Sequence, residues 1–241
     1  MKNTKSLIRY FSKGELILWS SSVLLIIISF ILFDRENYFT LINSLIGVTS
    51  LIFCAKGNPL GQILIIIFGI IYGFISYSFA YYGEMITYVG MTVPMAIIAR
   101  ISWLRNPFQG NKSEVKVSHL KSKDIVYMIV LSFLVTFIFY FILKELNTAN
   151  LIPSTLSVTT SFIAVYLTAK RSPYYALAYA ANDIVLIVLW ILAAIEDASY
   201  LSVIICFVVF LANDLYGYYN WKRMQKRQSK ITLPNPSESA L

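Results

Sequence analysis

Long uncharged runs recur along the whole of this 241-residue chain and constrain its fold more than any other feature. A helix needs about 20 mostly apolar residues to cross a bilayer, because each residue advances it by about 1.5 Å. Eight runs come close to or exceed that length: 16–33, 38–55, 60–81, 85–104, 124–144, 151–169, 173–194 and 198–221. We therefore predict an all-α polytopic membrane protein with eight transmembrane helices.

The composition excludes the soluble classes of protein. Apolar residues make up 58% of the chain and charged residues 13%, against about 25% charged in soluble domains. The net charge is +8, but the basic residues form short clusters between apolar runs, which is typical of loops that face a lipid bilayer and not of a nucleic-acid interface. His119 is the single histidine, and Cys54 and Cys206 lie inside apolar runs. We expect no metal site, no catalytic residue and no cofactor.

The basic residues also orient the helices. In an eight-helix arrangement, 17 of the 20 Lys and Arg residues fall on one side, Arg35 and Lys144 fall on the other, and Arg100 lies within a helix. Positively charged loops stay in the cytoplasm. We therefore predict a multi-pass protein of the cell membrane with both termini cytoplasmic.

A short motif occurs twice, 114 residues apart. Ala55-Lys56-Gly57-Asn58-Pro59 is echoed by 169–173 (AKRSP), and Trp103 and Trp221 each close a third helix further on. Because an odd number of spans joins the two units, they have the same orientation and form a parallel repeat. The predicted divisions are 1–37, a cytoplasmic tail and an extra membrane helix; 38–105, repeat 1; 106–150, a cytoplasmic linker and connecting helix; 151–223, repeat 2; and 224–241, a disordered cytoplasmic tail.

Two aspartates fall within the last two apolar runs, where a carboxylate costs at least about 2.5–3.5 kcal/mol. Asp183 stands at the centre of its run, and Tyr179 and Trp190 share its helical face. Asp214 stands nearer the cytoplasmic end of its run and has two interpretations: a functional acid, or a structural ion pair with Arg100. Asp183 could also have a purely structural role, in which hydrogen bonds to neighbouring helices satisfy its carboxyl group.

An acid beside aromatic rings suits a planar cation, because the rings stack and attract positive charge. Amide and hydroxyl groups nearby suit a hydroxyl-bearing ligand such as a riboside. We therefore predict a substrate-binding site for a small cationic aromatic molecule. Its candidate residues are Asp183, Asn182, Tyr179, Trp190, Tyr72, Tyr88, Thr92 and Asn213.

The stretches 169–173 (AKRSP), 181–185 (ANDIV), 199–201 (SYL) and 217–223 (GYYNWKR) resemble the PnuC family of vitamin transporters. The resemblance covers about 38–223. It implies two three-helix bundles joined by a linking helix, a homotrimer, and facilitated diffusion of nicotinamide riboside, with the product trapped by a cytoplasmic kinase. In that family an aromatic residue, often Trp, precedes the acid by one turn, and here that position holds Tyr179. Relatives can carry a Gln shortly after the proline, where this chain has Pro94-Met95-Ala96.

Several alternatives remain open from the sequence. Members of the same family carry thiamine, riboflavin or deoxynucleosides, and a proton-coupled version would use a titrating Asp183. From other classes, Asp183 and Asp214 could form an intramembrane aspartyl protease dyad, or the chain could be a nutrient-sensing receptor. Transport without catalysis is the leading hypothesis. The mononucleotide is disfavoured as cargo, because no Arg cluster for its phosphate lies in the membrane.

Overall fold

The computed structural model describes residues 10–78, 82–148, 150–195 and 197–232, and this part of the chain is almost entirely helical. The helices are α2 (Lys13–Phe33), α3 (Tyr38–Ala55), α4 (Leu60–Ser78), α5 (Tyr82–Ile86), the π-helix η1 (Thr87–Thr92), α6 (Val93–Arg105), α7 (Ser122–Glu145), α8 (Leu151–Ala169), α9 (Tyr174–Ala194), the 3-10 helix η2 (Ala198–Tyr200) and α10 (Leu201–Thr232). Within these residues, eight helical stretches are long and apolar enough to cross a membrane. The predicted all-α fold with eight spans is confirmed.

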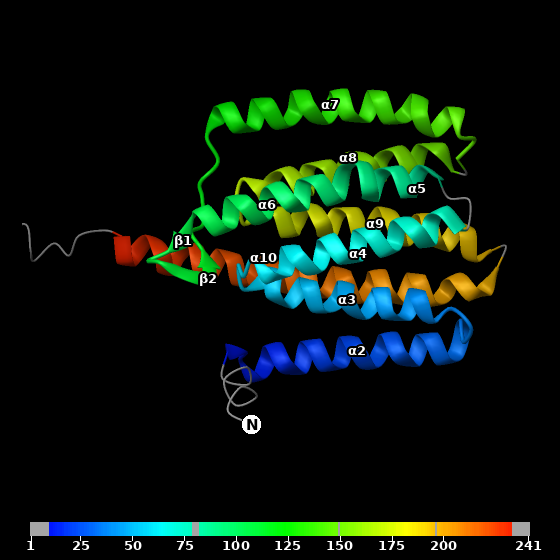
Figure 1. Cartoon of the computed structure of the whole chain (residues 1–241), viewed down its shortest axis with the longest axis horizontal. Coiled ribbons are helices and arrows are strands. Elements are labelled where there is room, and N and C mark those ends of the chain that lie inside the picture. The colour runs from blue at the N-terminus through cyan, green and yellow to red at the C-terminus, as the bar shows by residue number, and fades with distance from the viewer. Residues whose placement is uncertain (1–9, 79–81, 149, 196, 233–241) are drawn as a thin grey trace, which may run out of the picture.

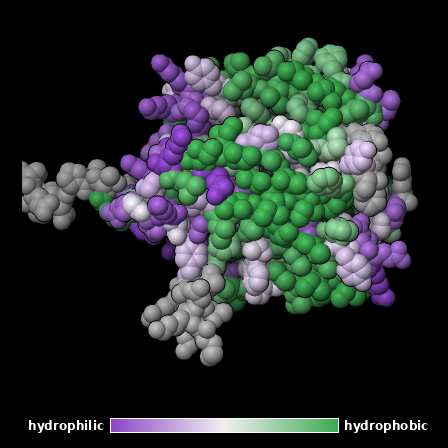
Figure 2. Space-filling view, viewed as in Figure 1, coloured by the Kyte–Doolittle hydropathy of each residue, from purple (hydrophilic) through white to green (hydrophobic). Residues whose placement is uncertain are grey.

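The long helices run back and forth along one direction, with α7 at one edge of the bundle and α2 at the opposite edge (Figure 1). A broad apolar band covers the middle of the molecule and hydrophilic residues gather at its two ends (Figure 2). Phe133 of α7 is 75% exposed, as expected for a side chain that faces lipid. We call the end with Lys56, Lys170 and the 105–123 segment the basic end, and the end with Asp34, Glu84 and Asp197 the acidic end.

The two AKxxP turns at the basic end have the same backbone conformation. Gly57 and Arg171, which are equivalent at the 114-residue offset, both adopt a positive φ, +66° and +57°. Asn58 donates its backbone N–H to Phe53, and Ser172 donates to Leu167 in the same way. This correspondence supports the predicted parallel repeat, whose boundaries stay a prediction.

The linker between the two repeats contacts both turns through its main chain. The N–H of Val115 donates to the carbonyl of Gly57 (3.0 Å), and the N–H of Ser118 donates to the carbonyl of Arg171 (2.9 Å). The same linker forms a small antiparallel hairpin of β1 (Pro107–Phe108) and β2 (Asn111–Val115). The segment predicted as a cytoplasmic linker is therefore folded, and it connects the two turns at the basic end.

Helix α10 continues beyond the apolar run to Thr232, so the predicted disordered tail is wrong for residues 224–232. The extension is held by Gln228, which accepts from the N–H of Val117 (2.8 Å) and donates to the carbonyl of Val115 (3.0 Å). Buried amide hydrogen bonds of this kind order a segment that composition alone marks as polar. Residues 233–241 lie outside the described part of the chain.

The extra helix α2 is bound to the repeats by polar contacts. Glu15 is buried and forms an ion pair with Lys56 of the first turn (3.0 Å) while it accepts from the hydroxyl of Tyr216 (2.9 Å). Near the middle of the helix, Ser22 accepts from the amide of Asn213 (2.9 Å). Helix α2 thus makes specific contacts with both α3 and α10.

Candidate functional site

A cavity of about 190 Å3 lies at the acidic end, between α2, α3, α4, α9 and α10. Aromatic side chains form much of its wall, among them Phe68, Tyr72, Trp190 and Tyr200. Its charged lining residues are Asp34, Glu84 and Asp197, and no Lys or Arg of the described chain lines it. An aromatic cavity with acidic groups favours a planar cation.

The carboxylate of Glu84 and the ring of Tyr72 form one unit in this wall. The hydroxyl of Tyr72 donates to Glu84 at 2.6 Å, a charge-assisted length for an O–H donor. At the mouth of the cavity, burial and the negative charge of Asp197 raise the pKa of Asp34. Asp197, by contrast, accepts from the backbone N–H of Ser199, which lowers its pKa.

Three aromatic rings pack together at this cavity, and two of them, Phe68 and Tyr72, line it. Tyr72 stacks on Phe68 with centroids 5.8 Å apart and lies 4.4 Å from the ring of Tyr88. The π-helix η1 brings Tyr88 to this position, and its Val89 packs so tightly on Gly73 that a Cβ there would lie 2.3 Å from Val89 Cγ2. Glycine at 73 therefore permits the close approach that places the Tyr88 ring.

Asp183 and Asp214 meet below these rings. Both are buried, 4% and 5% exposed, and their carboxyl groups lie within hydrogen-bonding reach of each other. No donor among the described residues bonds the buried Oδ2 of Asp183. The structural ion pair considered for Asp214 is thus not what the fold builds, because Arg100 is exposed and Asp214 faces Asp183.

The geometry of antiparallel helices explains why two acids at different depths meet. A Cβ built at Gly217 would lie 3.5 Å from that of Ala176, which fixes the level at which α9 and α10 touch. Asp183 lies seven residues beyond Ala176 and Asp214 three residues before Gly217, so at about 1.5 Å per residue their backbones differ in depth by about 6 Å. Each side chain leans towards the N-terminus of its own helix. In antiparallel helices the two carboxyls therefore lean towards one another.

Uncharged groups surround the pair. Tyr88 and Cys206 are electrostatic neighbours of Asp183, while Cys54 and Tyr175 are neighbours of Asp214. Asp183 thus lies on the side of the cavity, and Asp214 on the side of the basic end.

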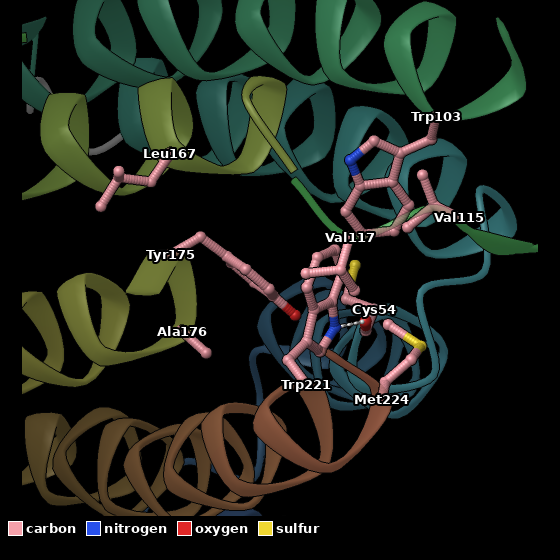
Figure 3. Packing of buried hydrophobic residues seen from close by; sticks show 9 residues of the cluster. All are labelled: Cys54, Trp103, Val115, Val117, Leu167, Tyr175, Ala176, Trp221 and Met224. Carbon is pink, nitrogen blue, oxygen red and sulfur yellow. Dashed lines mark hydrogen bonds between the residues drawn. The ribbon is translucent and has the colours of Figure 1, made fainter. Parts of the chain in front are cut away.

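The basic end is filled by a buried cluster of aromatic and apolar side chains (Figure 3). Trp103 and Trp221 are fully buried, and Tyr175 packs edge-on against Trp221 at 4.9 Å. Figure 3 shows Val115 of the linker and Met224 of α10 in the same cluster. The acid pair is therefore separated from the basic end by closely packed side chains.

The structure brings only some of the predicted site residues together. Asp183 and Tyr88 are neighbours, Tyr72 contacts Tyr88, and Tyr179 is an electrostatic neighbour of both acids. Trp190 shares the helical face of Asp183 but lines the cavity at the acidic end.

The remaining three candidates have other neighbours. The amide oxygen of Asn182 accepts from Thr160 (2.7 Å) and Ser161 (3.1 Å) of α8, and the amide nitrogen of Asn213 donates to Ser22 of α2. Thr92 donates to the carbonyl of Thr87 within its own helix, at 3.4 Å. Their roles in binding stay predictions that the geometry does not favour.

Asn43 and Glu84 belong to the site but were not among the predicted residues. Asn43 lines the cavity, is 2% exposed, and its Oδ1 has no hydrogen-bond partner among the described residues. A buried amide without a partner is a ready acceptor for a ligand hydroxyl. Asn43 stands within an apolar run, which was a usable signal, whereas Glu84 reads as an ordinary loop acid.

Comparisons with known proteins agree with this architecture. The family model described as nicotinamide mononucleotide transporter matches residues 37–223. A relative from Neisseria mucosa, the nicotinamide riboside transporter PnuC, is 24% identical over 201 residues, which cover 82% of this chain and 76% of the relative. The protein of the same name from Haemophilus influenzae is 24% identical over 193 residues, with 80% and 82% covered.

A solved structure supports the same fold. The crystal structure of the vitamin B3 transporter PnuC superposes with a TM-score of 0.78 at 22% identity and covers 90% of this chain and 94% of that one. Helix α2 precedes the range that the family model matches.

Proposed function

Because this chain belongs to the nicotinamide mononucleotide transporter family, we propose that it carries nicotinamide riboside, a cation without a phosphate, across the membrane. The observation that carries the proposal is the charge of the cavity. Its charged lining residues, Asp34, Glu84 and Asp197, are all acidic, and no basic residue of the described chain lines it to meet a phosphate. A pyridinium ring is attracted there, whereas the negative phosphate of the mononucleotide is repelled.

The substrate binds at two successive sites along one path. Its ring first stacks in the cavity at the acidic end against Trp190 and Tyr72, and its hydroxyls contact Asn43. Movement of Tyr72 and Tyr88 then admits it to Asp183, whose charge balances the pyridinium. The names of the relatives from Neisseria mucosa and Haemophilus influenzae support this cargo.

We propose uniport by alternating exposure of this path. The structure has a cavity at the acidic end and a packed aromatic cluster at the basic end. Passage to the basic end requires separation of Trp103 and Trp221 and release of the linker from Gly57 and Arg171. Cytoplasmic termini, a homotrimer, and trapping of the product by a cytoplasmic kinase complete the proposal and rest on charge distribution and family resemblance.

The paired aspartates raise the alternative of a protease, which shares one proton between two acids. The close packing of α9 on α10 at Ala176 and Gly217 argues against it, because a peptide has to reach both carboxyls. Family membership points the same way.

Uptake into liposomes without any ion gradient tests the proposed function. We expect the purified protein to admit labelled nicotinamide riboside until the concentrations are equal, and to admit the mononucleotide at the rate of empty liposomes. Thiamine, riboflavin and a deoxynucleoside serve as competitors. Faster uptake of a neutral competitor, or uptake only with a proton gradient, would refute the proposed cargo or the uniport mechanism respectively.

A further inference from the structure

The contact between Asp183 and Asp214 restricts how much charge the site can hold. Both carboxyls are buried within the membrane-spanning bundle, and they lie within hydrogen-bonding reach of each other. Two ionised carboxylates at this distance repel strongly in a medium of low dielectric constant. One proton between them removes the repulsion and supplies the hydrogen bond that joins them.

The neighbours of the pair offer no other source of compensation. The described groups that interact electrostatically with the pair are Tyr88 of η1, Tyr175 and Tyr179 of α9, Cys54 of α3 and Cys206 of α10. Phenol and thiol groups are neutral at physiological pH. No Lys or Arg of the described chain is among the groups that act on either acid. The proton count of the pair is therefore set by the two carboxyls themselves.

We propose that Asp183 and Asp214 share a single retained proton and act together as one monovalent anion, which matches the site to a cargo with one positive charge. This inference rests on the proposed function and makes Asp214 a specificity-determining residue. Asp183 meets the cargo, because it lies on the cavity side of the pair. Asp214 acts through Asp183 as a positioning residue that keeps the proton.

Uniport and proton coupling differ in the number of protons that the acid pair releases when the cargo binds. If the pair has one negative charge before binding and keeps its proton, the bound cation makes the site neutral and no proton is released. If the cargo displaced the shared proton instead, each binding event would release one proton. Neutral cargo would leave the buried negative charge without a partner, which is costly.

The first test needs no cargo. Infrared spectra of the purified full-length protein at neutral pH report the C=O stretch of protonated carboxyl groups. We expect a difference spectrum between wild type and Asp214→Asn to contain one such band, and the spectrum of Asp183→Asn to lack the same band. Glu84→Gln is the control for the carboxyl in the cavity wall, which bonds Tyr72. Absence of a protonated carboxyl band at the pair in the wild type would overturn the proposal, whatever the cargo is.

The second test measures charge recognition by calorimetry with nicotinamide riboside and its neutral dihydro form. In two buffers with different protonation enthalpies, we expect equal heats, which means no proton released. Asp214→Asn should weaken binding of the cation by no more than about tenfold, the value of one hydrogen bond. The double variant Asp183→Asn/Asp214→Asn should lose about 30-fold or more for the cation, because the buried anion is gone, and little for the neutral form.

The outcomes distinguish a failure of the shared proton from a failure of the proposed cargo. Release of one proton per cation bound, or a loss in Asp214→Asn as large as in the double variant, would overturn the shared proton. If neither form of the riboside binds to wild type while the infrared band is present, the proposed cargo fails and the shared proton stands.

Discussion

Trp103 and Trp221 pack against each other at 5.3 Å, and each bonds the opposite half of the molecule. The indole N–H of Trp103 donates to the carbonyl of Thr168 (2.9 Å), and that of Trp221 donates to Cys54 (2.8 Å). Cys54 and Thr168 are equivalent at the 114-residue offset. The pair thus makes a reciprocal exchange of hydrogen bonds between the two predicted repeats.

This exchange predicts equal losses from two substitutions far apart in sequence. Trp103→Phe and Trp221→Phe should each lower the free energy of unfolding by about 1–3 kcal/mol, since each leaves a buried carbonyl without its donor. Thermal unfolding in detergent measures the effect. Trp19→Phe, whose indole bonds Thr49 in a partly buried site, is the matched control and should cost less. A large loss in one tryptophan variant and none in the other would contradict the equivalence.

Glu15 predicts a structural role for the extra helix. Glu15→Gln leaves Lys56 without its counter-ion and should destabilise the protein by about 1–3 kcal/mol. The double variant Glu15→Gln/Lys56→Met should recover part of that loss, because the unpaired charge is removed with it. Unchanged stability in the single variant would mean that α2 does not support the bundle through this contact.

Asn43 predicts recognition of the ribose. Asn43→Ala removes the buried amide oxygen without a partner, and affinity for nicotinamide riboside should fall by about tenfold, as for the loss of one hydrogen bond. Calorimetry with the riboside and with free nicotinamide separates the two parts of the ligand. Asn182→Ala is the matched control, since that amide bonds Thr160. A larger effect at 182 than at 43 would mean that Asn182, and not Asn43, contacts the ligand.

We expect replacement of Asp34 to increase the stability of the fold in a pH-dependent way. Its pKa is raised by burial and by Asp197, so the charged form is less stable in the folded protein than in the unfolded chain. The cost is present above the raised pKa and absent below the ordinary value of about 4. Asp34→Asn should therefore raise the unfolding temperature at neutral pH and have no such effect in strong acid.

Asp197→Asn is the control of opposite sign for that experiment. The pKa of Asp197 is lowered by the backbone N–H of Ser199, so its charged form stabilises the fold at neutral pH and the contribution is lost as pH falls. We expect a lower unfolding temperature for this variant. Equal shifts in both variants would show that the measurement reports net charge and not these local contacts.

The sequence predicted the helices well because lipid leaves few alternatives to a long apolar helix. It predicted the directions of polar side chains less well. Neighbouring residues on a helix point about 100° apart, so Asn182 and Asp183 face different neighbours, and Asn182 bonds Thr160 of α8. The same holds for Asn213, which faces α2 while Asp214 faces Asp183.

The meeting of the two acids was not predictable from depth alone. Counting residues correctly separated Asp183 and Asp214 along the membrane normal, but it left out the lean of each side chain towards its own N-terminus. Tyr88 was found as an aromatic residue, although its π-helical backbone does not follow the 3.6-residue period on which sequence patterns depend.

The π-helix Thr87–Thr92 contains Tyr88, so the width of the helical turn around this ring depends on the number of residues in the stretch. A π-helical stretch accommodates a residue that an α-helix would not, so loss of one codon there would let the segment return to an ordinary α-helical ladder. The segments before and after the stretch would then keep nearly the same relative orientation, because the widened π-turn already absorbs the extra residue. Single-residue insertions and deletions in this stretch therefore give the scaffold a way to widen or narrow the turn that carries Tyr88 while the helices on either side keep their packing.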